Sequence, residues 1–300
     1  MDDAVQWLLQ GDVSVQYLTH RLLLGSDADT LAALQRRIET EGFGARLLSC
    51  RSENGHWGRW FYQPKWTSTH YTLTDLKDIG MPQACAPCCE MVVRAFDECM
   101  LPNGGINFAK TMMQSDVCVD GIILAYAAYF CPDEQRIERL ASHLLGAAKS
   151  DGGYSWDAAA ERGDAHTTIC VLEGFDAYQK AGFVHRLSDI KGAQRRALEM
   201  LFSRALFIGE DARYEKLAFP YRYRYDLLRF LDYCATADVP YDSRMEPAIR
   251  WLQSRRTADG RWLLEYAHKG NVHFDMETLR QPSRFITLKA LRILCQYAQG

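Results

Sequence analysis

The chain has 300 residues, of which 48% are hydrophobic and 24% are charged, a composition ordinary for a globular protein that buries a sizeable core. Its formal net charge is -3 at pH 7 with histidine neutral. No run of Lys and Arg offers the basic surface that binds a phosphate backbone. Nucleic acid is therefore excluded from the expected partners.

The N-terminal residues from Met1 to Trp7 lack the basic start and the apolar core of a signal peptide. No apolar stretch reaches the length that spans a membrane. Ten cysteines are present, and six stand singly in apolar contexts typical of buried free thiols: Cys50, Cys99, Cys131, Cys170, Cys234 and Cys295. We expect a reduced, cytoplasmic protein without a membrane span. The pattern leaves the oligomeric state open.

From residue 30 onward, one pattern recurs about every fifty residues. An amphipathic helix is followed by a glycine turn, an aromatic or polar residue, a polar loop and a second, more apolar helix. Glycine supplies the left-handed conformation that ends the first helix. The turns contain Gly55, Gly104, Gly152 and Gly260, and a degenerate copy lies near Gly209.

The second helix of each repeat begins with Ser, Thr or Asp cap residues and then becomes largely apolar. Such helices are covered on most sides, so we expect them to form an inner ring. The segment from Val13 to Leu24 is predicted to be one more inner helix. The other predicted inner helices are Thr69–Leu76, Ser115–Leu124, Ala165–Leu172, Tyr223–Leu231 and Ser283–Leu291.

Strand signals are poor throughout, and helix pairs at this period fit either an open superhelix or a closed ring. The inner helices begin with polar, aromatic and ionisable residues, which favours a ring around a cavity. The sequence therefore predicts an all-α fold, an α/α toroid formed by one domain of residues 1–300. Its expected parts are an N-terminal helical cap at 1–25 and repeats at 30–80, 90–131, 135–180, 192–236 and 245–299.

Three segments carry a resemblance to known families. The stretch from Trp251 to Trp262 resembles the Gln-Trp repeat of terpenoid cyclases and their relatives. The segments 104–118 and 152–174 are more similar to the catalytic subunit of the protein prenyltransferases. In that family an Asp-x-Cys pair and a later His bind zinc, and the resemblance implies the metal ligands Asp116, Cys118 and His166.

The chemistry of zinc agrees with this set, because zinc takes thiolate, imidazole and carboxylate ligands and a catalytic site leaves one position open. Such a zinc ion makes a bound thiol or water nucleophilic. The alternative is structural. Asp116 would then be an N-cap, Cys118 a buried small side chain and His166 a hydrogen-bonded core histidine.

Substrate-binding candidates fall near the same helix starts. Lys110 matches a basic position that helps to bind the prenyl diphosphate in the prenyltransferases. Arg222 and Arg284 add cations to that rim, unless they pair with Asp226 or Glu277. We expect Tyr71, Tyr225 and Phe285 to line an aromatic cavity, whereas Trp57, Trp156 and Trp262 are predicted to wedge between outer helices.

Other features depart from these families. The chain lacks the Asp-x-Asp-Asp acid of cyclases that protonate an alkene, and its length allows only one barrel. The protein prenyltransferases are longer and act with a second subunit, so their protein substrate and partner are not expected here. The run Cys85-x-x-Cys88-Cys89 has no second half-site, and we interpret it as a helix start with buried thiols.

These observations leave three hypotheses. The first is a prenyltransferase-like enzyme that acts on a small molecule, an isoprenoid among the candidates, with a zinc ion as cofactor. The second is a metal-free toroid enzyme for a carbohydrate-like substrate. Its catalytic acid and base candidates are His70, Asp116, Asp164, His166 and Tyr225. The third is a scaffold that binds a ligand without catalysis. In each hypothesis the candidate residues meet at one mouth of the ring, where the inner helices begin.

Overall fold

The computed structural model describes residues 3–109 and 114–297, and within these ranges the chain is helical, with isolated β-bridges but no β-strand. The all-α prediction is confirmed. One set of helices surrounds the centre: α2 (Val13–Thr19), α5 (Thr69–Asp78), α7 (Val117–Phe130), α9 (Ala165–Lys180), α11 (Leu227–Thr236) and α13 (Arg284–Tyr297).

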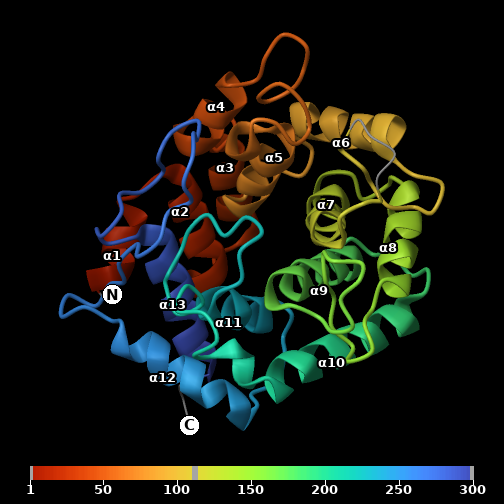
Figure 1. Ribbon diagram of the computed structural model, residues 1–300. Coiled ribbons are helices and arrows are strands. Elements are labelled where there is room, and N and C mark those ends of the chain that lie inside the picture. The colour runs from red at the N-terminus through yellow and green to blue at the C-terminus, as the bar shows by residue number, and fades with distance from the viewer. Residues whose placement is uncertain (1–2, 110–113, 298–300) are drawn as a thin grey trace.

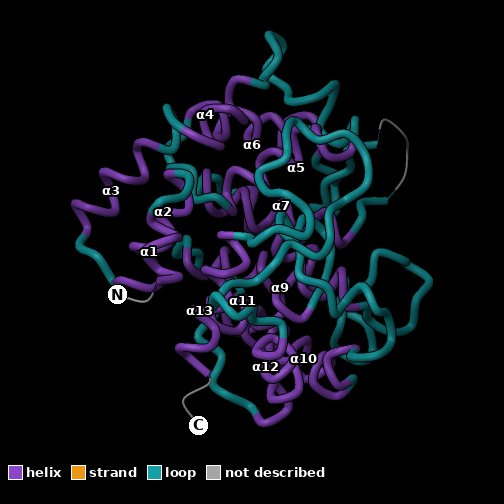
Figure 2. Tube along the Cα trace, turned by 90° about the vertical axis from the view of Figure 1, so that its left-hand side faces the viewer, coloured by secondary structure: helices purple, strands orange, loops and turns teal. Residues whose placement is uncertain are grey.

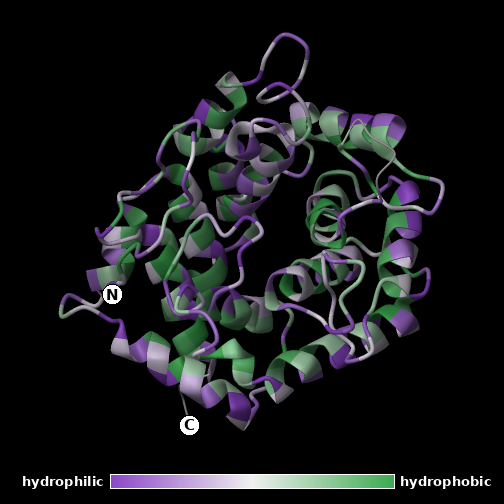
Figure 3. Ribbon diagram, viewed as in Figure 1, coloured by the Kyte–Doolittle hydropathy of each residue, from purple (hydrophilic) through white to green (hydrophobic). Residues whose placement is uncertain are grey.

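The remaining helices pack outside this inner set (Figure 1). They are α1 (Asp3–Leu9), α3 (Ala28–Arg37), α4 (Gly42–Ser49), α6 (Ala86–Cys99), α8 (Arg136–Gly146), α10 (Leu187–Ser203) and α12 (Glu246–Ser254). Figure 3 shows hydrophilic residues on the outer side of α8 and α10 and hydrophobic residues where they meet the inner helices. This amphipathic pattern is what a helix covered on one side requires.

The inner helices close into a ring because α13 packs against both α2 and α1 (Figure 1). The structure is thus the predicted α/α toroid. Within the ring α7 and α9 approach each other most closely. A Cβ atom on Gly121 would lie 2.8 Å from the backbone carbon of Cys170, and one on Gly174 would lie 2.6 Å from the carbonyl oxygen of Gly121. Glycine at these two positions therefore permits the contact.

The four glycine turns share one hydrogen-bond pattern. Each turn glycine has a φ between 80° and 94° and donates its N–H to the residue three positions earlier at 2.9 Å. That earlier residue donates its own N–H, at 2.8 Å, to the carbonyl four positions later. Because this backbone requires a positive φ, glycine is the residue that forms it without strain. The periodic glycines of the sequence are thus a repeated structural unit.

The residue two positions after each turn glycine connects the turn to the next inner helix. The N–H groups of Trp57, Tyr154 and Trp262 donate to threonine hydroxyls of α5, α9 and α13, and that of Ile106 donates to the carboxylate of Asp120 in α7. The indoles of Trp57 and Trp262 also donate to carbonyls of the preceding outer helices. The wedge prediction is confirmed for these two tryptophans. It is wrong for Trp156, which is 65% exposed, because Tyr154 occupies the equivalent place.

The two faces of the ring differ. The long connections from outer to inner helices gather on the face where the inner helices begin, at the right of Figure 2. One of these connections, residues 204–226, also reaches inward, since Tyr221 lies against side chains of α11 and α13. Among the described residues, no helix combines the length and the apolar character that crossing a membrane requires.

Candidate functional site

Asp116 is the N-cap of α7. Its Oδ1 accepts the backbone N–H groups of Cys118 at 2.9 Å and Val119 at 3.4 Å. Burial raises the pKa of the carboxyl, and these two N–H groups oppose that effect. The carboxylate therefore satisfies the helix terminus, which is the structural alternative that the sequence offered.

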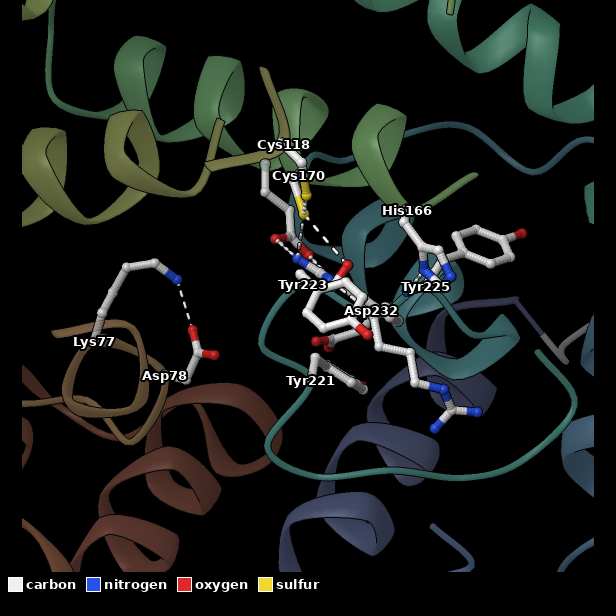
Figure 4. A network of polar contacts seen from close by, with 12 residues as sticks. Lys77, Asp78, Cys118, His166, Cys170, Tyr221, Tyr223, Tyr225 and Asp232 are labelled. Atoms are coloured by element: carbon white, nitrogen blue, oxygen red, sulfur yellow. Dashed lines mark hydrogen bonds and ion pairs between the residues drawn. The ribbon is translucent and has the colours of Figure 1, made fainter. Parts of the chain in front are cut away.

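Cys118 lies against another cysteine. Its Sγ is 3.7 Å from the Sγ of Cys170 in α9, and Cys170 Sγ lies 3.5 Å from a guanidinium nitrogen of Arg229 (Figure 4). The contact with Cys170, together with burial, raises the pKa of Cys118 well above its usual value. In this arrangement Cys118 is a neutral thiol. Cys170 had no place among the predicted site residues.

His166 is fixed by the backbone, because its Nδ1 accepts the N–H of Tyr225 at 2.8 Å. The ring also packs edge-on against Tyr214 and Tyr223. Burial lowers the pKa of His166 to about 4, although Asp164 acts in the opposite direction. Asp164 is itself the N-cap of α9, with its carboxylate accepting from the N–H and the hydroxyl of Thr167.

The three predicted zinc ligands are thus engaged in other contacts. In residues 3–109 and 114–297 there is no group of three or more His, Cys, Asp or Glu side chains placed to hold a metal ion. The described residues therefore do not form a site that fits zinc. Zinc binding stays a prediction. Lys110 lies outside the described residues.

The remaining aromatic and histidine candidates are fully buried. His70 contacts the rings of Tyr71, Phe108 and Tyr126, and burial lowers its pKa to about 3. The hydroxyl of Tyr71 lies 3.1 Å from that of Tyr62. Two further candidates have core partners: Tyr225 donates to the carbonyl of Leu206, and Phe285 stacks on Phe219 with centroids 4.0 Å apart.

The two predicted arginines have separate partners. Arg222 is buried and pairs with Asp75 of α5 at 3.2 Å, with its guanidinium 4.8 Å from the ring centroid of Trp66. Burial raises the pKa of Asp75 to about 6, and the charge of Arg222 limits that rise. Arg284 lies over Trp7 of α1 and donates to its carbonyl. Pairing with Asp226 or Glu277 is the alternative to a substrate role, and Arg284 does contact Glu277, whose Oε1 accepts its backbone N–H at 2.6 Å.

A cavity of about 470 Å³ occupies the centre of the ring. Its lining comes from the middle and the C-terminal ends of the inner helices, and the exposed residues Gln83, Lys180 and Asp238 stand at its rim. It therefore opens on the face where the inner helices end. The predicted site residues that the structure describes lie toward the opposite face and do not belong to this lining.

One wall of the cavity is apolar. It is formed mainly by Leu18 of α2, Leu22 of the following π-helix (His20–Leu24), and Ile122, Ala125 and Ala128 of α7. Ala177 of α9 and Leu288 of α13 also belong to it, next to the charged residues Asp176 and Lys289. The charged wall, on α5, α9, α11 and α13, carries paired charges, and its α5 part lies between α2 and α7 in the ring (Figure 1). The closest nitrogen to oxygen distances are 2.7 Å for Lys77–Asp78, 2.6 Å for Arg229–Glu173, 2.5 Å for Lys289–Asp232 and 2.7 Å for Lys180–Asp176.

Tyrosines complete the lining. They are Tyr126 and Tyr129 of α7, Tyr233 of α11 and Tyr221 of the 204–226 connection. Tyr126 also lies close to His70, with its hydroxyl 3.5 Å from Nδ1. Burial raises the pKa of the Tyr126 and Tyr221 phenols well above 10, so both are neutral hydroxyls at pH 7. Figure 4 shows Tyr221 and Asp232 across from Lys77 and Asp78.

The charged wall had a signal in the sequence. Glu173, Asp176 and Lys180 are spaced three and four residues apart, as are Arg229, Asp232 and Thr236. This spacing puts each set on one face of a helix. A charged face on an otherwise apolar inner helix indicates a polar cavity. The sequence prediction placed the site at the starts of the inner helices and so did not include this charged wall.

Another hollow of about 500 Å³ lies among residues 212–216 and 255–280. It is more open to solvent than the central cavity, and its lining includes Glu215, Lys216, Arg255 and Glu265. We place the candidate site in the central cavity because charged side chains from four inner helices and a buried tyrosine converge there. Ligand sites are typically enclosed hollows of about 300–1,000 Å³ with a few convergent polar groups.

The fold and this cavity define an α/α toroid with a central ligand-sized site. Neither a protein-family model nor a curated protein matches the chain. A solved structure of a protein from Actinoplanes has a TM-score of 0.49 and 15% identity, with 95% of this chain and 90% of that chain covered.

The type II terpene cyclase MstE from Scytonema has a TM-score of 0.34 and 15% identity, with 83% of this chain and 94% of that chain covered. A variant of the same cyclase in complex with geranylgeranyl dihydroxybenzoate gives the same score and identity, with 83% and 93% covered.

Proposed function

We propose that the chain is an enzyme that binds one small amphipathic molecule in its central cavity. The observation that carries the proposal is that the cavity lining combines apolar side chains, mainly from residues 18–22 and α7, with paired charges on α5, α9, α11 and α13. Such a site accepts both the apolar body and the polar group of one molecule. An isoprenoid meets this description, and its hydrocarbon chain suits the Leu, Ile and Ala side chains of the apolar wall.

The charged wall supports acid–base chemistry. Burial raises the pKa of Asp176, an effect that the ammonium group of Lys180 opposes. A raised pKa makes a carboxylate a stronger base toward a bound molecule. Tyr126 adds a neutral hydroxyl with His70 behind it. These groups could transfer a proton to or from the polar end of a bound molecule without a cofactor.

Binding of farnesol, titrated by calorimetry, tests the proposal. We expect one molecule per chain and a loss of at least tenfold in affinity in Ala177→Trp, because the indole would fill space at the apolar wall. Ala33→Trp is the matched control, since Ala33 is exposed on α3 and lies outside the cavity lining. Equal farnesol affinity in Ala177→Trp and the native chain would contradict the central site.

A hydroxyl-rich molecule such as a sugar is the second candidate ligand. The observation that favours it is the alternation of carboxylates, cations and tyrosines on the charged wall, because carboxylates and cations together satisfy many hydroxyl groups. The same titration with a disaccharide such as maltose separates the two candidates. Saturable binding of maltose that Ala177→Trp abolishes, with no binding of farnesol, would replace the first candidate by the second.

A further inference from the structure

Tyr221 is the one lining residue that the described structure brings to the cavity from the connection between α10 and α11. Its side chain is 5% exposed, and its hydroxyl has no hydrogen-bond partner among the described residues. A buried hydroxyl without a hydrogen-bond partner is unfavourable. A ligand in the cavity is a natural partner for such a group.

The surroundings of Tyr221 determine what its hydroxyl can do. Lys289 Nζ lies 4.8 Å from the ring centroid, and the Arg229 guanidinium carbon lies 5.7 Å from it. Cations over an aromatic face stabilise the ring in its place. The negative charges of Asp232 and Asp226, together with burial, keep the phenol protonated. Tyr221 can therefore donate a hydrogen bond to an acceptor on the ligand.

The charged side chains around the cavity indicate whether the ligand is charged or neutral. The described lining holds six Lys and Arg side chains and five Asp and Glu side chains. Lys77, Lys180, Arg229, Lys289 and Arg292 each have a carboxylate within 4.0 Å. The sixth cation, Arg21, is exposed and donates to the hydroxyl of Tyr17 at 3.4 Å. A diphosphate that binds the five paired cations would have to displace these half-buried carboxylates and would leave them close to its own negative charge, which is unfavourable. A neutral oxygen needs no such rearrangement.

We propose that the Tyr221 hydroxyl holds the head group of the cavity ligand by donating a hydrogen bond to a neutral oxygen, so that the site takes an alcohol or carbonyl compound with an apolar body and not a prenyl diphosphate. This inference rests on the proposed function and specifies its substrate class. It assigns Tyr221 a binding role that the resemblance to cyclases and prenyltransferases does not supply.

The experiment compares farnesol with farnesyl diphosphate, which share one hydrocarbon chain and differ in the head group. We expect the native protein to bind farnesol at least tenfold more tightly. In Tyr221→Phe we expect farnesol affinity to fall about tenfold, equal to about 1.4 kcal/mol, as the loss of one buried hydrogen bond requires. Because the hydroxyl has no protein partner, this variant should fold and melt at the same temperature as the native chain or higher.

Tyr154→Phe is the matched control. The Tyr154 hydroxyl is also buried without a partner in the described structure, but Tyr154 lies outside the cavity lining. Removal of the Tyr154 hydroxyl should leave the affinity for farnesol unchanged.

The outcomes separate the two proposals. Equal farnesol affinity in Tyr221→Phe and the native chain would overturn the role of Tyr221, and tighter binding of farnesyl diphosphate would overturn the neutral head group. Either result leaves the cavity as the binding site. Binding of neither compound would overturn the isoprenoid assignment itself.

Discussion

Asp116 shows how one residue can satisfy two hypotheses until its contacts are known. Its position before a cysteine two residues later matches a zinc-binding pattern, and its position before an apolar helix matches an N-cap. The structure shows the cap, with two backbone N–H groups donating to one carboxylate oxygen. Sequence spacing cannot distinguish the two roles, because both place a carboxylate at a helix start.

The cap role predicts the behaviour of two variants. Asp116→Ala should lose about 1 kcal/mol of unfolding free energy, the typical loss when an N-cap side chain is removed. Asp116→Asn should stay within about 0.5 kcal/mol of the native chain, since Asn caps helices about as well as Asp. Urea unfolding followed by circular dichroism measures both.

Metal analysis of the same proteins addresses the zinc prediction. The native chain and Asp116→Asn should have the same metal content if the carboxylate only caps α7. Stoichiometric zinc in the native chain that disappears in the equally stable Asp116→Asn would establish Asp116 as a metal ligand instead.

At the scale of elements, the ring could be predicted because its signals are local. Each glycine turn is formed within a few residues, and each inner helix shows its cap and its apolar run in consecutive positions. The cavity was harder to predict because its polar wall depends on distant partners. Glu173 and Arg229 form a hydrogen bond although they are 56 residues apart in the sequence. Lys289 and Asp232 do the same over 57 residues. The closure of the ring determines which charged side chains pair. Residue spacing along one helix cannot predict these pairs.

The contact between α7 and α9 gives a prediction at this scale. Gly121→Ala should destabilise the chain by about 1–3 kcal/mol, the usual loss when a side chain is forced into a packed interface, because the new Cβ would meet the Cys170 backbone at 2.8 Å. Gly146→Ala at the end of α8 is the control, since a Cβ there meets nothing within 4 Å. Urea unfolding midpoints compare the two variants. Equal midpoints would show that α7 and α9 can move apart with little loss of unfolding free energy.

The whole molecule holds several histidines in neutral form. Burial lowers the pKa of His70 and His268 to about 3 and that of His166 to about 4. The unfolded chain therefore binds more protons below pH 6.5, and stability falls as the pH drops through that value. Asp75 and Asp226 act in the opposite direction, because burial raises their pKa to about 6 and stability is gained as they protonate.

The histidines outweigh the two carboxyls. At pH 5.5 each histidine removes about 1.4 kcal/mol and each aspartate returns about 0.8 kcal/mol. These five groups together should therefore make the chain about 2–3 kcal/mol less stable than at pH 7.5. Guanidinium unfolding at both pH values measures the difference. His70→Phe should reduce it by about 1 kcal/mol, and an unchanged difference in this variant would show that His70 does not titrate on unfolding.

Closure of the ring also decides when a binding site exists. The apolar wall begins on α2, and the charged wall ends with Lys289 and Arg292 on α13. These two helices stand at opposite ends of the described chain and meet only at the seam of the ring. During synthesis on the ribosome, every helix up to α12 can emerge while the site still lacks one side. Ligand affinity should therefore appear late, in a single step, when α13 reaches α2.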